Sequence, residues 1–341
     1  MKRTQKLLIA IVSLAGILAL IFDSQTALIG ASEGIDLCIR TVIPSLFPFF
    51  ILSIILTTVI SNTRIPLLKP LCRLCKLPEG SESILLIGIL GGYPIGAQCI
   101  SNAYVSGQLS KENAQRMLGF CNNAGPAFLF GMVGPLFETK TAAILLWLIH
   151  IISAIATGFL LPKARSEAIV EVKPLPISLG RVMQKSIFAM ANVCGWVIVF
   201  RVILGFMRRW FLWLLPSSLQ VLLCGIFELS NGCIELYALD SCTLKFIYAV
   251  VFLGLGGLCV LMQTLSAVSQ AGLDLGMYIP GKILQTAFSC ILAVPTSNTL
   301  FSSEKAIPYS VIVLPLIIIG IAVIFLKNKE NNSSIPALSD V

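Results

Sequence analysis

Long apolar runs without a charged residue constrain this chain more than any other feature. Residues 7–22, 41–60 and 141–161 carry no Asp, Glu, Lys or Arg, and each approaches the roughly 20 residues that a membrane-crossing helix needs. Of the 341 residues, 57% are hydrophobic and 12% are charged, against about 45–50% and about 25% in soluble proteins. Only helices and closed barrels satisfy their backbone groups in lipid, and continuous rather than alternating runs exclude a barrel. We therefore predict an all-α polytopic membrane protein.

The basic residues predict how the helices are oriented, because Lys and Arg concentrate in cytoplasmic connections. Lys2, Arg3 and Lys6 precede the first apolar run, which we interpret as an uncleaved helix with the N-terminus in the cytoplasm. The acidic segment 23–36 is then expected outside, and the basic connection 64–76 returns to the cytoplasm. Continuing along the chain gives eight crossing helices and a cytoplasmic C-terminus.

Two segments of the first half contain residues that interrupt helices. Residues 83–107 are long enough to cross once, but Gly91, Gly92, Pro94 and Gly96 lie in the middle of this segment, and glycine and proline do not propagate a helix. Both ends of the segment adjoin basic connections, so we predict a re-entrant hairpin that enters and leaves on the cytoplasmic side. Residues 117–137 carry a second break at 122–126 and are expected to form an interrupted crossing helix.

The second half repeats this plan. Residues 221–227 resemble 84–90, and both end in Gly-Ile and one further apolar residue before a break, which is Gly91–Gly96 in the first copy and Ser230–Gly232 in the second. A further interrupted crossing is expected near residues 254–257. Counting crossings places the second hairpin on the opposite side from the first, which is the inverted repeat typical of secondary transporters. In this arrangement Arg208 and Arg209 fall outside, against the positive-inside rule.

We accordingly divide the chain into six parts. These are an N-terminal helix with its connection (1–30), a first repeat (31–161), a cytoplasmic linker (162–184), an inverted second repeat (185–299), a C-terminal helix (300–326) and a polar tail (327–341).

The breaks predict a binding site. Interrupted helices persist in a membrane only where protein or a wet cavity satisfies the freed backbone groups, and the N-termini of the half-helices favour an anion. The alternative is that these small and polar residues serve only helix packing. Matching breaks in two repeats favour the site. The residues predicted to line it are Gly91, Gly92, Tyr93, Pro94, Gly96, Asn122, Asn123, Gly125, Ser230, Asn231 and Gly232.

Three charged residues lie inside the predicted apolar spans, where each costs at least about 2.5–3.5 kcal/mol. Glu228 precedes the second break by two residues, and we assign it a coupling or gating role rather than a purely structural one. Glu235 is expected near the exit of the hairpin, where it can be solvated. Arg201 either snorkels to a helix end or binds an anion. His150, the single histidine, is expected to be a packing residue rather than a proton relay.

Other classes of function lack a sequence signal. Cys72 and Cys75 form one CxxC without a second pair or a nearby His, which does not complete a zinc site. The sequence has no P-loop, no Ser/His/Asp arrangement and no pair of catalytic carboxylates, so we expect neither an enzyme nor a cofactor. The formal net charge of +8 is explained by membrane orientation, and we expect no nucleic-acid partner.

Four motifs carry a resemblance to a known family. They are Pro44-Ser45-Leu46-Phe47-Pro48-Phe49, Gly92-Tyr93-Pro94-Ile95-Gly96-Ala97, Asn123-Ala124-Gly125-Pro126-Ala127-Phe128 and Glu228-Leu229-Ser230-Asn231-Gly232. Together they resemble the YlbJ family of sporulation integral membrane proteins, over about residues 5 to 325. The resemblance implies the nucleoside-recognition Gate domain, a fold like that of the concentrative nucleoside transporters, and a spore-forming Firmicute. The Gly-Tyr-Pro motif replaces the acidic motif that nucleoside transporters carry in their first hairpin.

The breaks and the resemblance together predict a function. We expect a transporter of a small organic anion, with dipicolinate moved from the mother cell toward the forespore as the best candidate, in the mother-cell membrane around the forespore. The alternatives are a non-transporting membrane scaffold for spore cortex or coat assembly and a nucleoside-type transporter. Membrane lipid and the anion are the expected partners, and the sequence leaves a homo-oligomer open.

Overall fold

The structure, a computed structural model, describes residues 3–60, 63–164 and 178–332. The predicted linker 162–184 and tail 327–341 therefore lie partly outside the described residues. The described residues form helices and connections without a β-strand, which confirms the all-α prediction. The α-helices are α1 (Arg3–Phe22), α2 (Ser24–Leu37), α3 (Ile43–Ile60), α4 (Lys69–Leu74), α5 (Glu82–Leu90), α6 (Ile95–Val105), α7 (Lys111–Leu118), α8 (Pro126–Phe128), α9 (Lys140–Leu160), α10 (Leu179–Trp210), α11 (Ser217–Phe227), α12 (Leu229–Glu235), α13 (Cys242–Leu255), α14 (Gly257–Val268), α15 (Tyr278–Leu300) and α16 (Val313–Asn332).

Several of these helices have the length and composition of membrane spans. Within the described residues, four segments are long and apolar enough to cross a membrane: Ser24–Ile60, Lys140–Leu160, Leu179–Trp210 and Cys242–Ala271. Shorter apolar helices accompany them, among them Lys6–Phe22 and Tyr309–Val323. Large apolar side chains on the outside of α1 and α10, such as Leu7 and Phe188, are exposed, as expected of a surface that faces lipid. These observations support a polytopic membrane protein.

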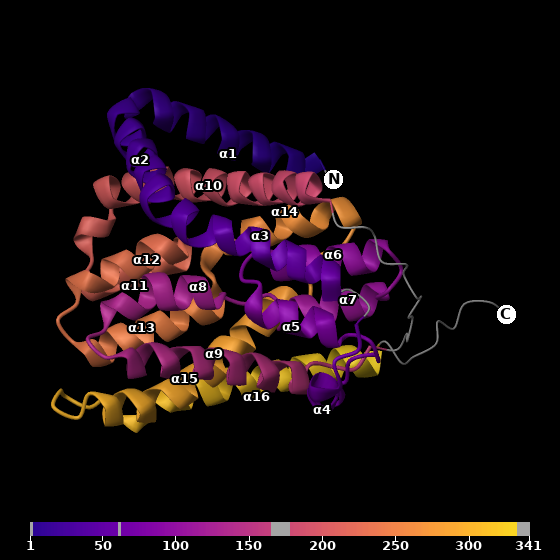
Figure 1. Cartoon of the computed structure of the whole chain (residues 1–341). Coiled ribbons are helices and arrows are strands. Elements are labelled where there is room, and N and C mark those ends of the chain that lie inside the picture. Colours follow the sequence, from indigo (N-terminus) through magenta and orange to yellow (C-terminus); the bar gives the residue numbers. More distant parts are fainter. Residues whose placement is uncertain (1–2, 61–62, 165–177, 333–341) are drawn as a thin grey trace.

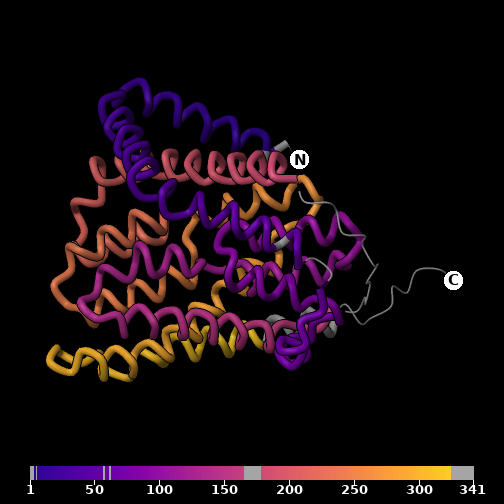
Figure 2. Tube along the Cα trace, viewed as in Figure 1, coloured from indigo at the N-terminus to yellow at the C-terminus, as the bar shows by residue number. Residues whose placement is uncertain are grey.

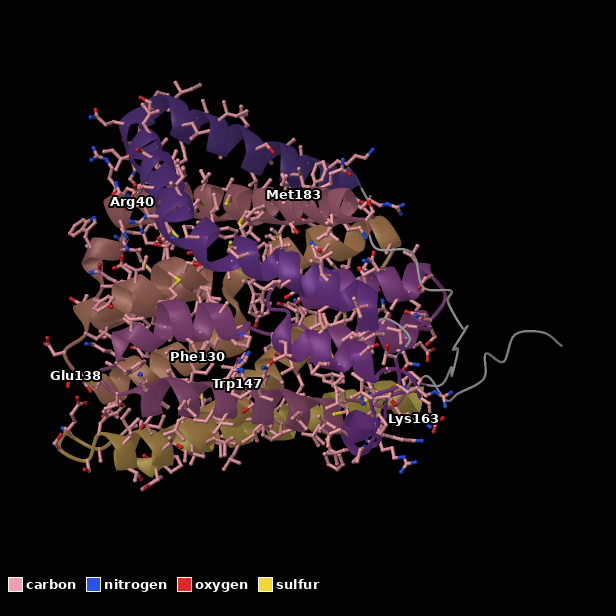
Figure 3. The ribbon with its side chains drawn as sticks, in the orientation of Figure 1. Arg40, Phe130, Glu138, Trp147, Lys163 and Met183 are labelled. Atoms are coloured by element: carbon pink, nitrogen blue, oxygen red, sulfur yellow. The ribbon has the colours of Figure 1, made fainter. Side chains whose placement is uncertain are left out.

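The helical pairs α5–α6 and α11–α12 lie at opposite ends of the molecule. Most helices run along the horizontal direction of Figure 1, where α5 and α6 occupy the right-hand half and α11 and α12 the left-hand half. The two interrupted helices each extend from one end to the other. α7 lies on the right and α8, which follows it, on the left, whereas α13 lies on the left and α14, which follows it, on the right. Figure 2 shows that α1 begins on the right-hand side and that α16 runs from the left-hand end toward the right. Lys163 lies at the right-hand end, whereas Arg40 and Glu138 lie at the other (Figure 3).

The helices are interrupted where glycine, proline and asparagine occur in the sequence. α5 ends and α6 begins around Gly91–Pro94, and residues 119–125 separate α7 from α8. Glu228 separates α11 from α12. Gly256 has φ of 73° and Gly257 has φ of 76°, which end α13 and start α14 within one turn. This left-handed backbone favours glycine because it has no Cβ.

One connection differs from the expectation. The acidic segment 23–36 is not an irregular connection, because α2 covers most of it and continues through a π-helical turn, Cys38–Val42, into α3. α2 packs closely on α10: a Cβ added to Gly30 or Gly34 would lie 3.0 Å from the Cα of Val202 or Ile198, respectively. The expected helix 41–60 is therefore the second part of a longer one. The N-terminus of α2 is capped by Asp23, whose side chain accepts a hydrogen bond from the Thr26 N–H.

Glu304 ties the connection between α15 and α16 to the start of α13. Its carboxylate accepts hydrogen bonds from the N–H groups of Cys242 and Thr243 at 2.8 and 2.9 Å and from the Ser241 hydroxyl at 2.8 Å. Partial burial acts to raise the pKa of Glu304, but these three hydrogen bonds favour the carboxylate and together lower the pKa to about 2. The interaction is therefore retained at any physiological pH.

The pair α11 and α12 depends on two facing glycines. A Cβ added to Gly232 would lie 2.1 Å from the Cα of Gly225, so the two backbones are in direct contact. A Cβ added to Gly225 would in turn lie 2.2 Å from the ring of Phe252 on α13. Glycine at both positions is thus required by close approach.

We expect Gly232→Ala to destabilise the protein, because overpacking costs about 1–3 kcal/mol and backbone atoms adjust less easily than side chains. Gly195→Ala on α10 is the matched control, since nothing lies within 4 Å of the added Cβ and alanine favours a helix by about 1 kcal/mol. The measurement is the midpoint of thermal unfolding of each purified variant in detergent. Equal midpoints for the two variants would contradict the contact.

Candidate functional site

A small cavity lies where three of the four breaks meet α14. It encloses about 40 Å³, room for about three water molecules. Apolar walls come from α3 and α10, including Phe49, Phe50 and Val197. Of the residues predicted from the sequence, Gly91, Gly92, Tyr93, Gly125, Glu228 and Ser230 line it. The other predicted residues do not line it: Pro94, Gly96, Asn122, Asn123, Asn231 and Gly232.

The glycines of the first hairpin allow it to touch the first interrupted helix. A Cβ on Gly92 would lie 3.3 Å from the Cα of Gly125, and a Cβ on Gly125 would lie 3.0 Å from the Cα of Gly92. A Cβ on Gly96 would lie 2.5 Å from the carbonyl oxygen of Cys121. These positions bring the hairpin tip against residues 121–125 with no space for a side chain.

Asn122 and Asn123 hold the first break in place. Asn122 Oδ1 accepts a hydrogen bond from the Ala97 N–H at 3.2 Å, and its Nδ2 donates to Thr264 Oγ1 at 2.9 Å. Asn123 Nδ2 donates to the carbonyl oxygens of Gly88 and Phe120 at 3.2 and 2.7 Å. Both side chains are fully buried. In this conformation their amide groups satisfy protein backbone and neighbouring side chains.

His150 also serves the first break. Its Nε2 accepts a hydrogen bond from the Ala124 N–H at 3.1 Å, so this nitrogen is the unprotonated one. Gln285 Nε2 lies 3.5 Å from Nδ1 and donates to the His150 carbonyl oxygen at 3.3 Å. The imidazole thus occupies a fixed position in the polar cluster and is 2% exposed.

Lys282 is a site residue that the sequence reasoning missed. Its ammonium donates to Gln285 Oε1 at 2.8 Å, Asn123 Oδ1 at 3.3 Å and the Tyr93 hydroxyl at 3.4 Å. Lys282 was assigned no role from the sequence, and it lies in the first turns of α15 (Tyr278–Leu300). The available signal was Gln285, a second polar residue one turn later on the same helix face.

Three charged residues that the sequence analysis did not single out are buried in the structure. They are Lys282, Arg116 and Glu82. Arg116 donates to the carbonyl oxygens of Gly158 and Leu161 at the C-terminus of α9, at 2.6 and 3.3 Å, and its guanidinium lies over the Phe120 ring. A cation at the C-terminus of a helix is favoured by the helix dipole.

Glu228 caps the second break. Its Oε2 accepts hydrogen bonds from the Asn231 N–H at 2.6 Å and from Asn231 Nδ2 at 2.8 Å. Asn231 Oδ1 in turn accepts from Arg201 Nη1 at 2.8 Å, and Arg201 Nη2 pairs with Glu33 at 2.8 Å. A continuous chain of hydrogen bonds thus runs from the half-exposed Glu33 to the buried Glu228.

The two arginines that conflicted with the positive-inside rule have acidic partners. Arg209 pairs with Asp23 at 2.9 Å, and Arg208 pairs with Glu235 and also donates to Cys224 Sγ. Both guanidinium groups are thus paired, but the positive-inside rule counts Lys and Arg rather than net charge, so the conflict stays. Glu235 is therefore an ion-pair partner as well as a partly solvated residue.

The cysteines form no evident metal site. Cys72 and Cys75 are buried and free, and no cluster of three or more metal-ligating side chains occurs in the part of the chain that the structure describes.

Comparison with known proteins gives one informative result. The chain is 24% identical over 327 residues to the sporulation integral membrane protein YlbJ of Bacillus subtilis (strain 168), covering 82% of this chain and 79% of that protein. The resemblance to YlbJ is confirmed. No family model matches the chain, and no solved structure matches it. The chain is thus a homologue of a sporulation integral membrane protein, in agreement with its apolar helices.

We expect Asn122→Ala to lower the stability of the protein. The substitution leaves the buried Ala97 N–H without its acceptor, and a buried unsatisfied donor costs about 1–3 kcal/mol. Asn102→Ala on the exposed face of α6 is the control. Thermal unfolding of the two purified variants in detergent is the measurement. If Asn122→Ala melts at the same temperature as Asn102→Ala, Asn122 does not secure the break.

Proposed function

We propose that this protein is a membrane transporter of a small organic anion that acts in sporulation. Dipicolinate, moved from the mother cell toward the forespore, is the substrate that we propose, and the mother-cell membrane around the forespore is the proposed location. The observation that carries the proposal is one cavity at which residues of both hairpin tips, the first interrupted helix and α14 meet. A central site between two broken-helix units is the arrangement by which secondary transporters alternate access.

We further propose that the two halves form an inverted repeat. In support, the hairpins α5–α6 and α11–α12 lie at opposite ends of the molecule, and each is followed by an interrupted helix (Figure 1). An inverted pair of this kind supplies one hairpin to each side of the membrane. Movement of either hairpin relative to the opposite half would then open the cavity to one side only.

The size of the cavity bears on how a substrate would enter under the proposal. The cavity of about 40 Å³ has room for a few water molecules only, so a pyridine dicarboxylate would require the cavity to widen. The Gly92–Gly125 contact closes one side of the cavity, and its walls are mostly apolar. Opening therefore requires the hairpin tips to separate from the breaks, which exposes the polar cluster behind them.

The charge of the proposed substrate is supported by the cluster beside the cavity. Lys282 has only neutral acceptors around its ammonium. Glu228, which is also buried and lines the cavity, would repel an anion, but the Asn231 amide groups and, through them, Arg201 stabilise it. We assign Glu228 a coupling or gating role, in which protonation changes its contacts at the second hairpin tip.

The inverted repeat predicts that the connections containing Gln108 and Asp240 lie on opposite sides of the membrane. Single cysteines introduced as Gln108→Cys and Asp240→Cys should react with a membrane-impermeant maleimide from opposite faces of sealed vesicles. The unsubstituted chain measures labelling of the native cysteines, most of which are buried. Labelling of both positions from the same face would exclude the inverted repeat.

The transport proposal predicts uptake of dipicolinate by vesicles that contain the purified protein. Asn123→Ala should reduce this uptake at least about tenfold, because it removes two buried hydrogen bonds at the first break. Asn102→Ala should leave it unchanged. In a sporulating host, Asn123→Ala and Glu228→Gln should both lower spore dipicolinate while the protein still reaches the membrane.

Three results would contradict the proposal in different ways. Uptake of nucleosides but not of dipicolinate would favour the nucleoside-type transporter. Absence of uptake of either, with normal sporulation in the Asn123→Ala strain, would favour the scaffold. Normal spore dipicolinate in that strain would also remove Asn123 from the site.

A further inference from the structure

The most unusual charge in the described part of the molecule is the ammonium of Lys282. The side chain is 3% exposed, and no carboxylate of the described residues lies within ion-pair distance of it. Its acceptors are an amide oxygen of Gln285, an amide oxygen of Asn123 and the Tyr93 hydroxyl. Buried charges are normally paired, because removing a charge from water costs several kcal/mol. The described residues thus supply no counter-charge to Lys282.

Several other cations of the helices have a source of negative charge beside them. Arg201, Arg208 and Arg209 each contact a carboxylate. Arg116 has no acidic partner, but it lies at the C-terminus of α9, where carbonyl oxygens present partial negative charge. Lys282, unlike Arg116, lies near the positive end of a helix dipole. It is the fifth residue of α15, close to the N-terminus of the helix, where the dipole disfavours a cation.

The remaining groups near Lys282 supply no negative charge. The rings of Tyr93 and Tyr278 lie 5.2 and 5.8 Å from the ammonium, Cys121 is a buried thiol, and His150 is reached only through Gln285. Aromatic faces stabilise a cation by about 0.5–2 kcal/mol, which offsets only part of the cost of burial. The described surroundings of Lys282 thus consist of neutral acceptors and aromatic rings.

Tyr93 connects this ammonium to the cavity. It lines the cavity, and its hydroxyl contacts Lys282 and donates to the Leu253 carbonyl oxygen at 3.1 Å, at the end of α13. A single side chain of the hairpin tip therefore lies between Lys282 and the space where a substrate would enter. Withdrawal of the tip would remove Tyr93 and expose the ammonium.

We propose that Lys282 binds a carboxylate of the transported anion, which replaces the Tyr93 hydroxyl when the first hairpin opens. The proposal rests on the proposed function and specifies its substrate class as a carboxylate rather than a neutral or cationic molecule. Before the substrate binds, the Tyr93 hydroxyl accepts a hydrogen bond from Lys282 and donates one to the Leu253 carbonyl oxygen of α13. Exchange of one oxygen ligand for another keeps the ammonium hydrogen-bonded throughout.

The test measures binding of three ligands to the purified full chain in detergent: dipicolinate, pyridine-2-carboxylate and the neutral pyridine-2,6-dicarboxamide. The unsubstituted protein should bind dipicolinate more tightly than the diamide. Lys282→Gln should weaken dipicolinate binding at least about tenfold and leave the diamide unchanged, because one charge-assisted hydrogen bond is lost. Lys305→Gln, an exposed lysine in the connection before α16, is the control for charge alone and should change neither ligand.

Tyr93→Phe keeps the test decisive if Lys282→Gln does not fold. This variant retains the ammonium and removes the hydroxyl that competes with the ligand, so it should bind dipicolinate at least as tightly and keep the preference for charge. Loss of the preference in Tyr93→Phe would assign recognition to the hydroxyl and overturn the inference. An unchanged preference in a folded Lys282→Gln would overturn it while leaving the transport proposal intact. Failure of the unsubstituted protein to bind or take up any of the ligands would overturn both.

Discussion

The structure depends on satisfying the backbone groups that the four breaks release inside an apolar protein. A peptide group without a hydrogen bond is expensive in a membrane, since no water is available to replace the lost partner. The chain meets this requirement with side chains from distant segments. Asn122 accepts from Ala97, His150 accepts from Ala124, and Glu228 accepts from Asn231. Each acceptor serves the first turn of a half-helix or the residues just before it, where N–H groups have no intrahelical partner.

This use of side chains changes the meaning of the polar residues near the cavity. From the sequence, the asparagines at the breaks were candidates to donate directly to a substrate. In the structure, Asn122 and Asn123 donate to Thr264, Gly88 and Phe120. A ligand that bound to these amides would have to break contacts that hold the first break together. Lys282 is different, because its three acceptors are neutral and a carboxylate is a stronger acceptor for an ammonium than any of them.

The sequence was informative where structure follows from local backbone chemistry. Glycine and proline at residues 91–96 and glycine at 256–257 indicated the breaks, since their effect on a helix does not require knowledge of any partner. The helical state of α2 was missed because its acidic residues suggested a solvated connection. Glu33 is paired with Arg201, 168 residues away, and Asp36 with Arg40. Lys282 was missed for a similar reason: its contact to Asn123 spans 159 residues, and no single-sequence pattern reports such a contact.

The tip of the first hairpin makes two kinds of contact, a close backbone contact and buried hydrogen bonds. Gly92 and Gly125 bring two backbones together with no side chain between them, a contact that gains dispersion energy. Tyr93, the next residue, makes two hydrogen bonds that bridge α15 and α13. Separating Tyr93 from its partners would leave an ammonium and a carbonyl oxygen that require new polar partners. Under the transport proposal, a polar ligand is therefore the kind of molecule that could replace Tyr93 if the hairpin tip moves.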